Sequence, residues 1–262
     1  MKRTIQSAIR SLHVSLARPL PERLGIYFHN LPAEDWTAFR SMVGLFRDLG
    51  YKFVNAEELA IGSSGKAAYL SFDDNHRSWR EALWLFEELE VSVTFYLNTA
   101  PLRDRAEPGD IRAYFKRIAE DPDQSMPLSS DEVAELASHG HTIGAHTHSH
   151  SALSHLSAAA ARAEIDTSRS ILAQIIGAPV QHFAYPFGMR RYFTEELRAY
   201  CMTTGFRTVA NAIPGLQFAG HRPEAIQRTP WNLRRSSAHN LENLRIDGRL
   251  FERFTGRSPA PF

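Results

Sequence analysis

Short apolar segments alternate with amphipathic helical segments along most of this chain, and this alternation restricts the fold more than any other feature. The apolar segments are five or six residues long, as buried strands are. The expected strands are 24–29, 52–56, 67–72, 92–97, 141–145, 182–186 and 206–210. The expected helices are 34–49, 79–90, 129–140, 157–176 and 194–203, with further ones near 110–120 and within 238–253. Repeated β-α units predict a parallel sheet with helices outside it.

Polar side chains gather where several of these strands end. The clusters are Asp73-Asp74, His146 to His150 and Tyr185 to Gly188, and His29 ends a fourth strand. In β/α barrels and open α/β sheets, functional sites are built at the carboxyl ends of the strands. We therefore expect these clusters to converge on one site.

The composition limits the chemistry that such a site can use. The 262 residues include twelve histidines but a single cysteine, Cys201, and the formal net charge is +1. One cysteine excludes an internal disulfide and any zinc site built on paired cysteines. A metal would have to use histidines and carboxylates. The small net charge is no reason to expect nucleic acid as a partner.

The aspartate pair in SFDDN (71–75) has two interpretations. Adjacent carboxylates at a buried strand end repel each other unless a cation is present. A metal would relieve the repulsion by binding one carboxylate and leaving the other as a base. The alternative is a solvent-exposed turn, in which Asp and Asn are common.

The histidines of GAHTHSHSAL (144–153) are also open to two interpretations. His146 and His150 can face one centre if the chain coils after the strand, while His148 would point elsewhere. The alternative is a histidine-rich surface loop. Neutral imidazole suits Zn, Ni, Co or Fe. Two histidines and one aspartate make three ligands, and an open fourth position is typical of a catalytic zinc site.

Three segments, SFDDN, HTHSHSAL and FAYPFG, resemble in this order the motifs of the metal-dependent polysaccharide deacetylases (NodB homology, carbohydrate esterase family 4). LGIYFHN and FRDLGYKFVNAEEL also resemble the start of the exopolysaccharide-deacetylase branch. The similarity covers roughly residues 24–210. It implies an α/β fold, a distorted (β/α) barrel of about seven parallel strands with outer helices.

The resemblance implies a role for each residue of the motifs. Asp73 would be the general base, and Asp74, His146 and His150 would bind a divalent metal, with zinc expected first and cobalt or nickel as alternatives. Phe187 would offer its backbone N–H to the oxyanion.

The sequence departs from the family pattern in two places. Ala184 stands where the third motif usually has an arginine that orients the base, and no Leu-x-His motif lies near the C-terminus. His29 resembles the histidine that can act as general acid in the exopolysaccharide branch. The alternative for His29 is a structural role at its strand end.

Three further residues are expected to bind substrate. Thr147, next to the first histidine ligand, would support the loop or contact the sugar. Tyr185 and Trp231 could stack on sugar faces, although such aromatic side chains more often belong to the core.

The expected reaction is removal of an N-acetyl group from an amino sugar in a glycan, glycolipid or sugar conjugate. A divalent metal polarises the carbonyl and acidifies water. Asp73 would take the proton, and His29 would protonate the leaving amine. Two alternatives stay open: an O-acetyl esterase or other amide hydrolase on the same scaffold, and a glycan-binding relative without catalysis.

Residues 24–262 are expected to form a single deacetylase domain with an insertion near 101–128. Residues 1–23 would be an N-terminal extension with apolar residues at helical spacing. This extension lacks an uninterrupted apolar segment, so we expect a cytoplasmic protein, or one peripheral to the inner membrane, without a transmembrane segment. The oligomeric state is left open.

Charge is uneven along the chain. Residues 190–262 carry twelve arginines and six acidic residues. A solvated face is one explanation. The other is a basic rim for an anionic or lipid-linked carbohydrate.

Overall fold

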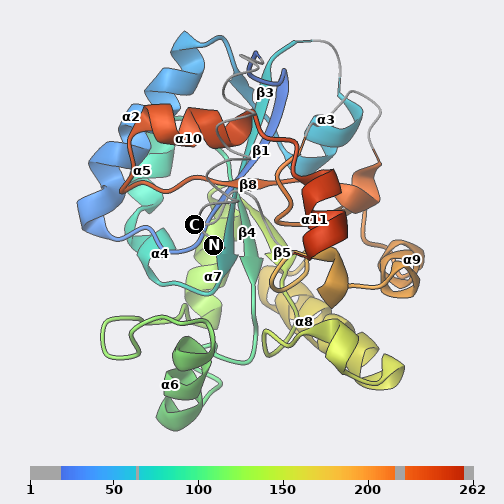
Figure 1. Cartoon of the computed structure of the whole chain (residues 1–262). Helices are drawn as coiled ribbons and strands as arrows, with labels where there is room; N and C mark the ends of the chain where they lie inside the picture. Colours follow the sequence, from blue (N-terminus) through green and yellow to red (C-terminus); the bar gives the residue numbers. More distant parts are fainter. Residues whose placement is uncertain (1–18, 63–64, 216–221, 257–262) are drawn as a thin grey trace, which may run out of the picture.

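A curled parallel sheet forms the centre of the molecule (Figure 1). The computed structural model describes residues 19–62, 65–215 and 222–256. Seven strands follow one another in the order β7-β6-β5-β4-β3-β1-β8, and β2 pairs with the start of β3. The strands are β1 (Arg23–Phe28), β2 (Lys52–Phe53), β3 (Ala67–Asp74), β4 (Thr94–Leu97), β5 (Thr142–Ala145), β6 (His182–Ala184), β7 (Thr208–Ala210) and β8 (Thr229–Pro230). The expected distorted barrel of about seven parallel strands is confirmed.

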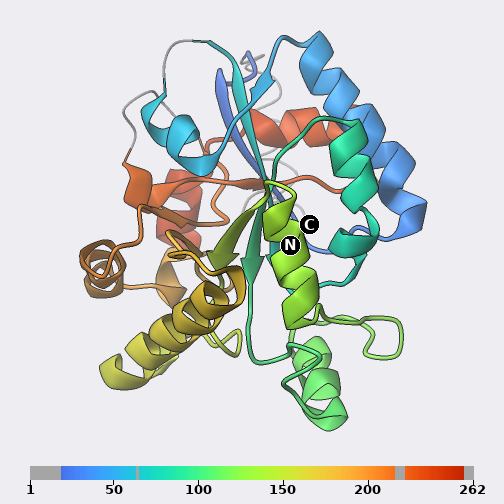
Figure 2. The ribbon, with the colours of Figure 1, turned by 180° about the vertical axis from the view of Figure 1, so that it is seen from behind.

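Helices surround this sheet, and Figure 2 shows α7 and α8 lying outside it, where both contact β5. The α-helices are α2 (Trp36–Asp48), α3 (Ala56–Ile61), α4 (Ser78–Glu81), α5 (Leu83–Glu88), α6 (Pro108–Arg117), α7 (Ser130–Ser138), α8 (Ala158–Ile176), α9 (Glu195–Thr203), α10 (Ser237–Leu244) and α11 (Arg249–Thr255). Short 3₁₀ helices are η1 (Ala33–Asp35), η2 (Leu153–His155), η3 (Arg190–Tyr192) and η4 (Pro223–Ala225).

Local sequence signals fix the ends of these helices. Ser129 and Glu132 form the predicted capping box of α7, each side chain accepting a hydrogen bond from the other's backbone N–H. Gly177, with φ 66°, ends α8 in the left-handed conformation that glycine adopts without strain.

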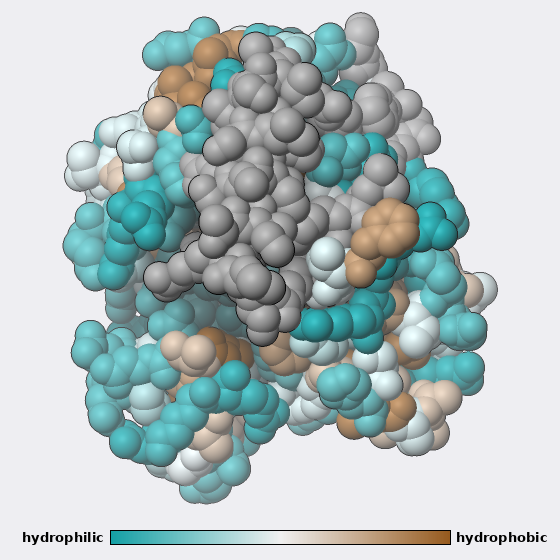
Figure 3. All heavy atoms as spheres, in the orientation of Figure 1, coloured by the Kyte–Doolittle hydropathy of each residue, from teal (hydrophilic) through white to brown (hydrophobic). Residues whose placement is uncertain are grey.

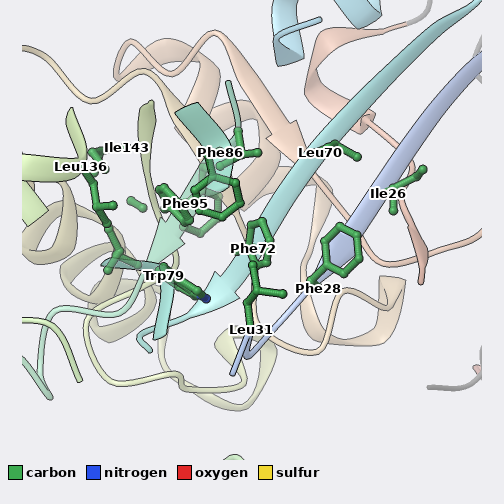
Figure 4. Packing of buried hydrophobic residues seen from close by; sticks show 14 of the residues in the cluster. Ile26, Phe28, Leu31, Leu70, Phe72, Trp79, Phe86, Phe95, Leu136 and Ile143 are labelled. Atoms are coloured by element: carbon green, nitrogen blue, oxygen red, sulfur yellow. The ribbon is translucent and has the colours of Figure 1, made fainter. Parts of the chain in front are cut away.

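Alternation along β3 divides the core into two parts. Leu70 and Phe72 point toward the outer helices, where Trp79 stacks on Phe95 with ring centroids 5.0 Å apart (Figure 4). Tyr69 points the other way, into a smaller cluster on the concave side of the sheet. Successive side chains of a strand face opposite sides, so this division extends to the aspartates that end β3.

The segment from Ile226 to Trp231 connects the two edges of the curled sheet. Ile226 bridges to Ala210 at the end of β7, and β8 then pairs with β1. Gly25 permits the close approach, because a Cβ there would lie 2.2 Å from the carbonyl oxygen of Gln227. The segment thereby joins β7 to β1 across the opening of the curled sheet.

Several elements differ from the sequence-based expectation. The segment expected as one helix over 79–90 is split into α4 and α5, and α10 and α11 replace the single helix expected within 238–253. Neither α3 nor β8 was expected. β8 has two residues, one of them Pro230, and so carries no periodic signal.

The excursion expected over 101–128 contains α6, which projects at the bottom of Figure 1. Most of the expected N-terminal extension, residues 1–18, lies outside the described residues. No helix in the described ranges is long and apolar enough to cross a bilayer. Around the grey residues, the face in Figure 3 is mainly hydrophilic, with separate apolar patches.

Candidate active site

Strand register brings the predicted site residues to one edge of the sheet. Asp74 at the end of β3 pairs with Leu97 of β4, and Leu97 pairs with Ala145 of β5. His146 follows Ala145 directly, and its N–H donates to the carbonyl oxygen of Leu97 at 2.9 Å. The carboxyl ends of the strands therefore converge as expected.

The two neighbouring aspartates face different surroundings. Asp73 lies on the concave side, where Arg228 donates hydrogen bonds of 2.6 and 2.8 Å to its two carboxylate oxygens. Asp74 has a φ of 85° and turns toward the histidine loop. Both are 4% exposed, which excludes the exposed-turn alternative for SFDDN.

Asp74, His146 and His150 form a buried cluster whose potential ligand atoms all lie within 4.8 Å of one another. Nε2 of His150 is 3.2 Å and Nε2 of His146 is 3.7 Å from Oδ1 of Asp74. His146 donates from Nδ1 to the carbonyl oxygen of Ala184 at 2.7 Å, so a neutral ring presents the Nε2 lone pair to Asp74.

This donor set fits a divalent cation. Oδ1 of Asp74 is buried and accepts no hydrogen bond from the described residues. A buried carboxylate oxygen without a donor is costly unless a cation is bound. One carboxylate and two imidazoles suit zinc, with further positions left for substrate or water.

Burial and neighbouring charges favour the metal-binding protonation states. Burial alone would raise the pKa of Asp74, but His150, with His29 and His146, holds that pKa well below its usual value. Burial lowers the pKa of His146 to about 4. At neutral pH Asp74 is therefore a carboxylate and His146 is neutral.

Backbone strain is concentrated at the site. Six non-glycine residues of the described chain have positive φ, and four of them are Asp74, Thr147, His150 and Phe187. Such conformations cost of order 1–3 kcal/mol each and persist only where the surroundings enforce them. Thr147 supplies one constraint, because its Oγ1 accepts a 3.1 Å hydrogen bond from the N–H of His150.

Asn98, which the sequence analysis did not identify, supplies a second constraint. Its buried Nδ2 donates to the carbonyl oxygens of His146 and Thr147, the latter at 3.2 Å. Tyr114 of α6 donates to Oδ1 of Asn98 at 2.9 Å, and Asn75 donates to its backbone oxygen at 3.0 Å. The excursion that contains α6 is thus bonded to the histidine loop.

Two more histidines face the second oxygen of Asp74. Nε2 of His29 lies 3.9 Å from Oδ2, and the His29 side chain is 34% exposed. Nε2 of His76 lies 4.0 Å from the same oxygen but is buried without a hydrogen bond to the described residues. Sequence reasoning missed His76, although it follows SFDDN directly.

Arg228 is the third residue that sequence reasoning missed. It is fully buried between the rings of Tyr27 and Tyr96, and it also donates to Oγ of Ser71 at 2.9 Å. Burial opposes its charged form, but the Asp73 carboxylate outweighs burial and raises the pKa of Arg228. Arg228 thus supplies the partner of Asp73 that was missing at position 184.

The remaining predicted site residues differ in how exposed they are and in what they contact. Phe187 is 43% exposed beside the ring of His150, and its backbone N–H has no acceptor in the described chain. Thr147 is fully buried. Tyr185 is 1% exposed and stacks on Phe193, so its ring lies in the core. Trp231 is largely buried but lines a cavity that it shares with His29.

Ion pairs with carboxylates neutralise much of the positive charge noted in residues 190–262. The paired arginines are Arg190, Arg198, Arg207, Arg222, Arg228, Arg234 and Arg249. This pairing accounts for most of the arginines of the segment without an anionic ligand.

The model of the family described as "Polysaccharide deacetylase" matches residues 61–209, which is more than half of the chain. The chain belongs to the polysaccharide deacetylase family. The match spans the aspartates, the histidine loop and the FAYPFG segment. The protein is accordingly a carbohydrate deacetylase, a hydrolase.

Solved structures share the fold of this deacetylase. The Streptococcus pyogenes deacetylase PplD, in complex with acetate, has a TM-score of 0.64 at 17% identity, over 86% of this chain and 97% of that one. IcaB from Ammonifex degensii has a TM-score of 0.61 at 18% identity, over 80% and 91%. A de-N-acetylase from Aggregatibacter actinomycetemcomitans has a TM-score of 0.63 at 13% identity, over 84% and 98%. No curated protein sequence matches the chain.

Proposed function

We propose that this deacetylase removes the N-acetyl group of an amino sugar in a glycan, glycolipid or sugar conjugate, with a divalent metal held by Asp74, His146 and His150. The observation that carries the proposal is the buried Oδ1 of Asp74, which accepts no hydrogen bond from the described residues and faces two imidazole nitrogens beside a second, separately held carboxylate. A structural role alone would not require this separation.

A divalent ion at these three residues would polarise the acetyl carbonyl and lower the pKa of water. Zinc suits the donor set, with cobalt and nickel as alternatives. The site therefore combines an electrophilic position with a neighbouring base.

Asp73 is the proton acceptor in this proposal. Arg228 occupies one lone pair on each carboxylate oxygen, which leaves others free to take the proton of the attacking water. The bidentate pair also fixes the plane of the carboxylate. Arg228 therefore acts as a positioning residue.

His29 and Phe187 complete the proton and charge transfers. His29 is partly exposed at the edge of the site and protonates the leaving amine. The free N–H of Phe187 donates to the oxyanion. Trp231 contacts the sugar from the shared cavity, whereas Thr147 and Tyr185 act on substrate binding by shaping the loops around it.

The test is acetate release by zinc-loaded protein from a panel of N-acetylated and O-acetylated oligosaccharides and phosphate-bearing sugar conjugates. We expect turnover of an N-acetyl substrate and a loss of about 10²- to 10⁴-fold in Asp73→Asn, with bound zinc retained. Preference for the esters would favour the esterase alternative. Glycan binding without turnover, unchanged by Asp73→Asn, would contradict the proposal.

A further inference from the structure

We propose that the cavity beside His29 binds a sugar unit that carries a free ammonium group, next to the unit being deacetylated. This inference rests on the proposed function and names the substrate class: glycans that are already partly deacetylated.

The cavity adjoins the reacting centre. It measures about 250 Å³, and its lining includes His29, Asp35, Glu120, Trp231, Leu233 and Arg234. His29 is shared with the Asp74 cluster, which its Nε2 approaches to 3.9 Å. A ligand in this cavity is therefore separated from the proposed metal-binding residues by the side chain of His29.

Size and lining suit a single sugar ring. Pockets for drug-sized ligands measure about 300–1,000 Å³, so this cavity is matched to a smaller group. Trp231 and Leu233 offer apolar surface for the C–H face of a sugar. Polar side chains of the same lining can form hydrogen bonds with the hydroxyl groups of the sugar.

The charge of the lining favours a cation. Arg234 is the only cationic side chain among the lining residues besides His29, and it is shared by Glu34 at 3.3 Å and Asp35 at 3.4 Å. The carboxylate of Glu120 makes no hydrogen bond or ion pair with the described residues. Burial raises the pKa of Glu120, and His29 and Arg234 oppose this rise without cancelling it, so the Glu120 carboxylate is only partly compensated by positive charge.

An ammonium group would compensate Glu120 with a charge-assisted hydrogen bond. An acetamido group at the same place would bring a neutral amide instead. The cavity thus discriminates by charge between a deacetylated and an acetylated neighbouring sugar unit. The discriminating side chain is that of Glu120, which follows α6 in the excursion over 101–128.

The test compares two oligosaccharides, a fully N-acetylated glucosamine tetramer and the same tetramer with one free amine. Binding is measured by calorimetry on zinc-loaded Asp73→Asn protein, so that neither tetramer is turned over, and acetate release by the protein with Asp73 intact is recorded in parallel. We expect the cationic tetramer to bind on the order of tenfold more tightly to the Asp73→Asn protein. Adding Glu120→Gln should bring that ratio close to one.

Asp110→Asn is the matched control, because it removes an exposed carboxylate of α6 that does not line the cavity. The ratio should stay unchanged in this variant, and thermal unfolding should show that both variants fold. Equal binding of the two tetramers, binding of neither, or a preference that survives Glu120→Gln would overturn the inference. Acetate release with equal binding leaves the proposed function intact; a charge preference without acetate release contradicts the proposed function alone.

Discussion

At the scale of single residues, the site depends on two adjacent aspartates that cannot serve the same purpose. Alternation along β3 places Asp73 against Arg228 on the concave side, and positive φ turns Asp74 toward the histidines. Asp73 is paired with a guanidinium, whereas Asp74 faces the two imidazoles that would hold a metal with it. A separate positive charge at each carboxylate would offset the repulsion that made SFDDN notable in the sequence.

The first prediction concerns the fork of hydrogen bonds from Arg228. Arg228→Lys keeps the positive charge but cannot hold both oxygens of Asp73, so kcat should fall roughly tenfold or more while KM changes little. Arg228→Gln leaves a buried carboxylate unpaired and should also destabilise the fold by about 3–5 kcal/mol. Steady-state kinetics and urea unfolding measure the two effects.

Arg169→Gln is the control for Arg228, since Arg169 is partly buried but, within the described ranges, donates only to backbone carbonyls of Val180 and Thr204. It should leave kcat unchanged. A kcat for Arg228→Lys equal to that of the wild type would show that the orientation of Asp73 does not depend on the guanidinium.

At the scale of elements, periodic apolar patterns predicted most of the helices and strands, and elements without such a pattern were missed. The periodic helices and apolar strands, and the convergence of their polar ends, follow from local patterning. β8 could not be predicted, because two residues with a proline carry no period, and Arg228 enters the site with it. For Tyr185 the sequence left a core position open beside a role in substrate binding, since its stacking on Phe193 depends on the tertiary fold.

Also at the scale of elements, the excursion containing α6 supports the histidine loop. Tyr114→Phe removes the hydrogen bond to Asn98 that helps hold the strained loop. We expect a loss of about 1 kcal/mol of stability and roughly tenfold weaker zinc binding. Competition with a chromogenic chelator measures the affinity.

Tyr200→Phe provides the comparison, because it deletes a surface hydroxyl whose 2.6 Å hydrogen bond goes to Asp166. Zinc affinity should not change in that variant. If both variants bind zinc as the wild type does, the excursion does not support the loop.

At the scale of the whole molecule, buried histidines link stability to pH. His141 is 7% exposed between Phe86 and Phe95, and burial lowers its pKa to about 4. The unfolded chain, with a pKa near 6.5, binds the proton first as pH falls. Stability is therefore lost between about pH 6.5 and pH 4, by roughly 2 kcal/mol at pH 5 from this residue.

His141→Asn should reduce that pH-dependent loss, because asparagine keeps an acceptor near the position that takes the Val93 N–H but does not titrate. His139→Asn, at a half-exposed neighbour, should change the slope much less. Urea unfolding at pH 7.5 and pH 5 measures both. An unchanged slope in His141→Asn would contradict the assignment.

The central claim is that Asp74, His146 and His150 bind the metal on which deacetylation depends. The most direct measurement is the rate of acetate release after a chelator strips the protein and zinc is added back. We predict that stripping lowers the rate at least about 100-fold, that one equivalent of zinc restores it, and that Asp74→Asn regains neither zinc nor activity. A stripped enzyme with its full rate, or an Asp74→Asn variant as active as the wild type, would contradict the claim.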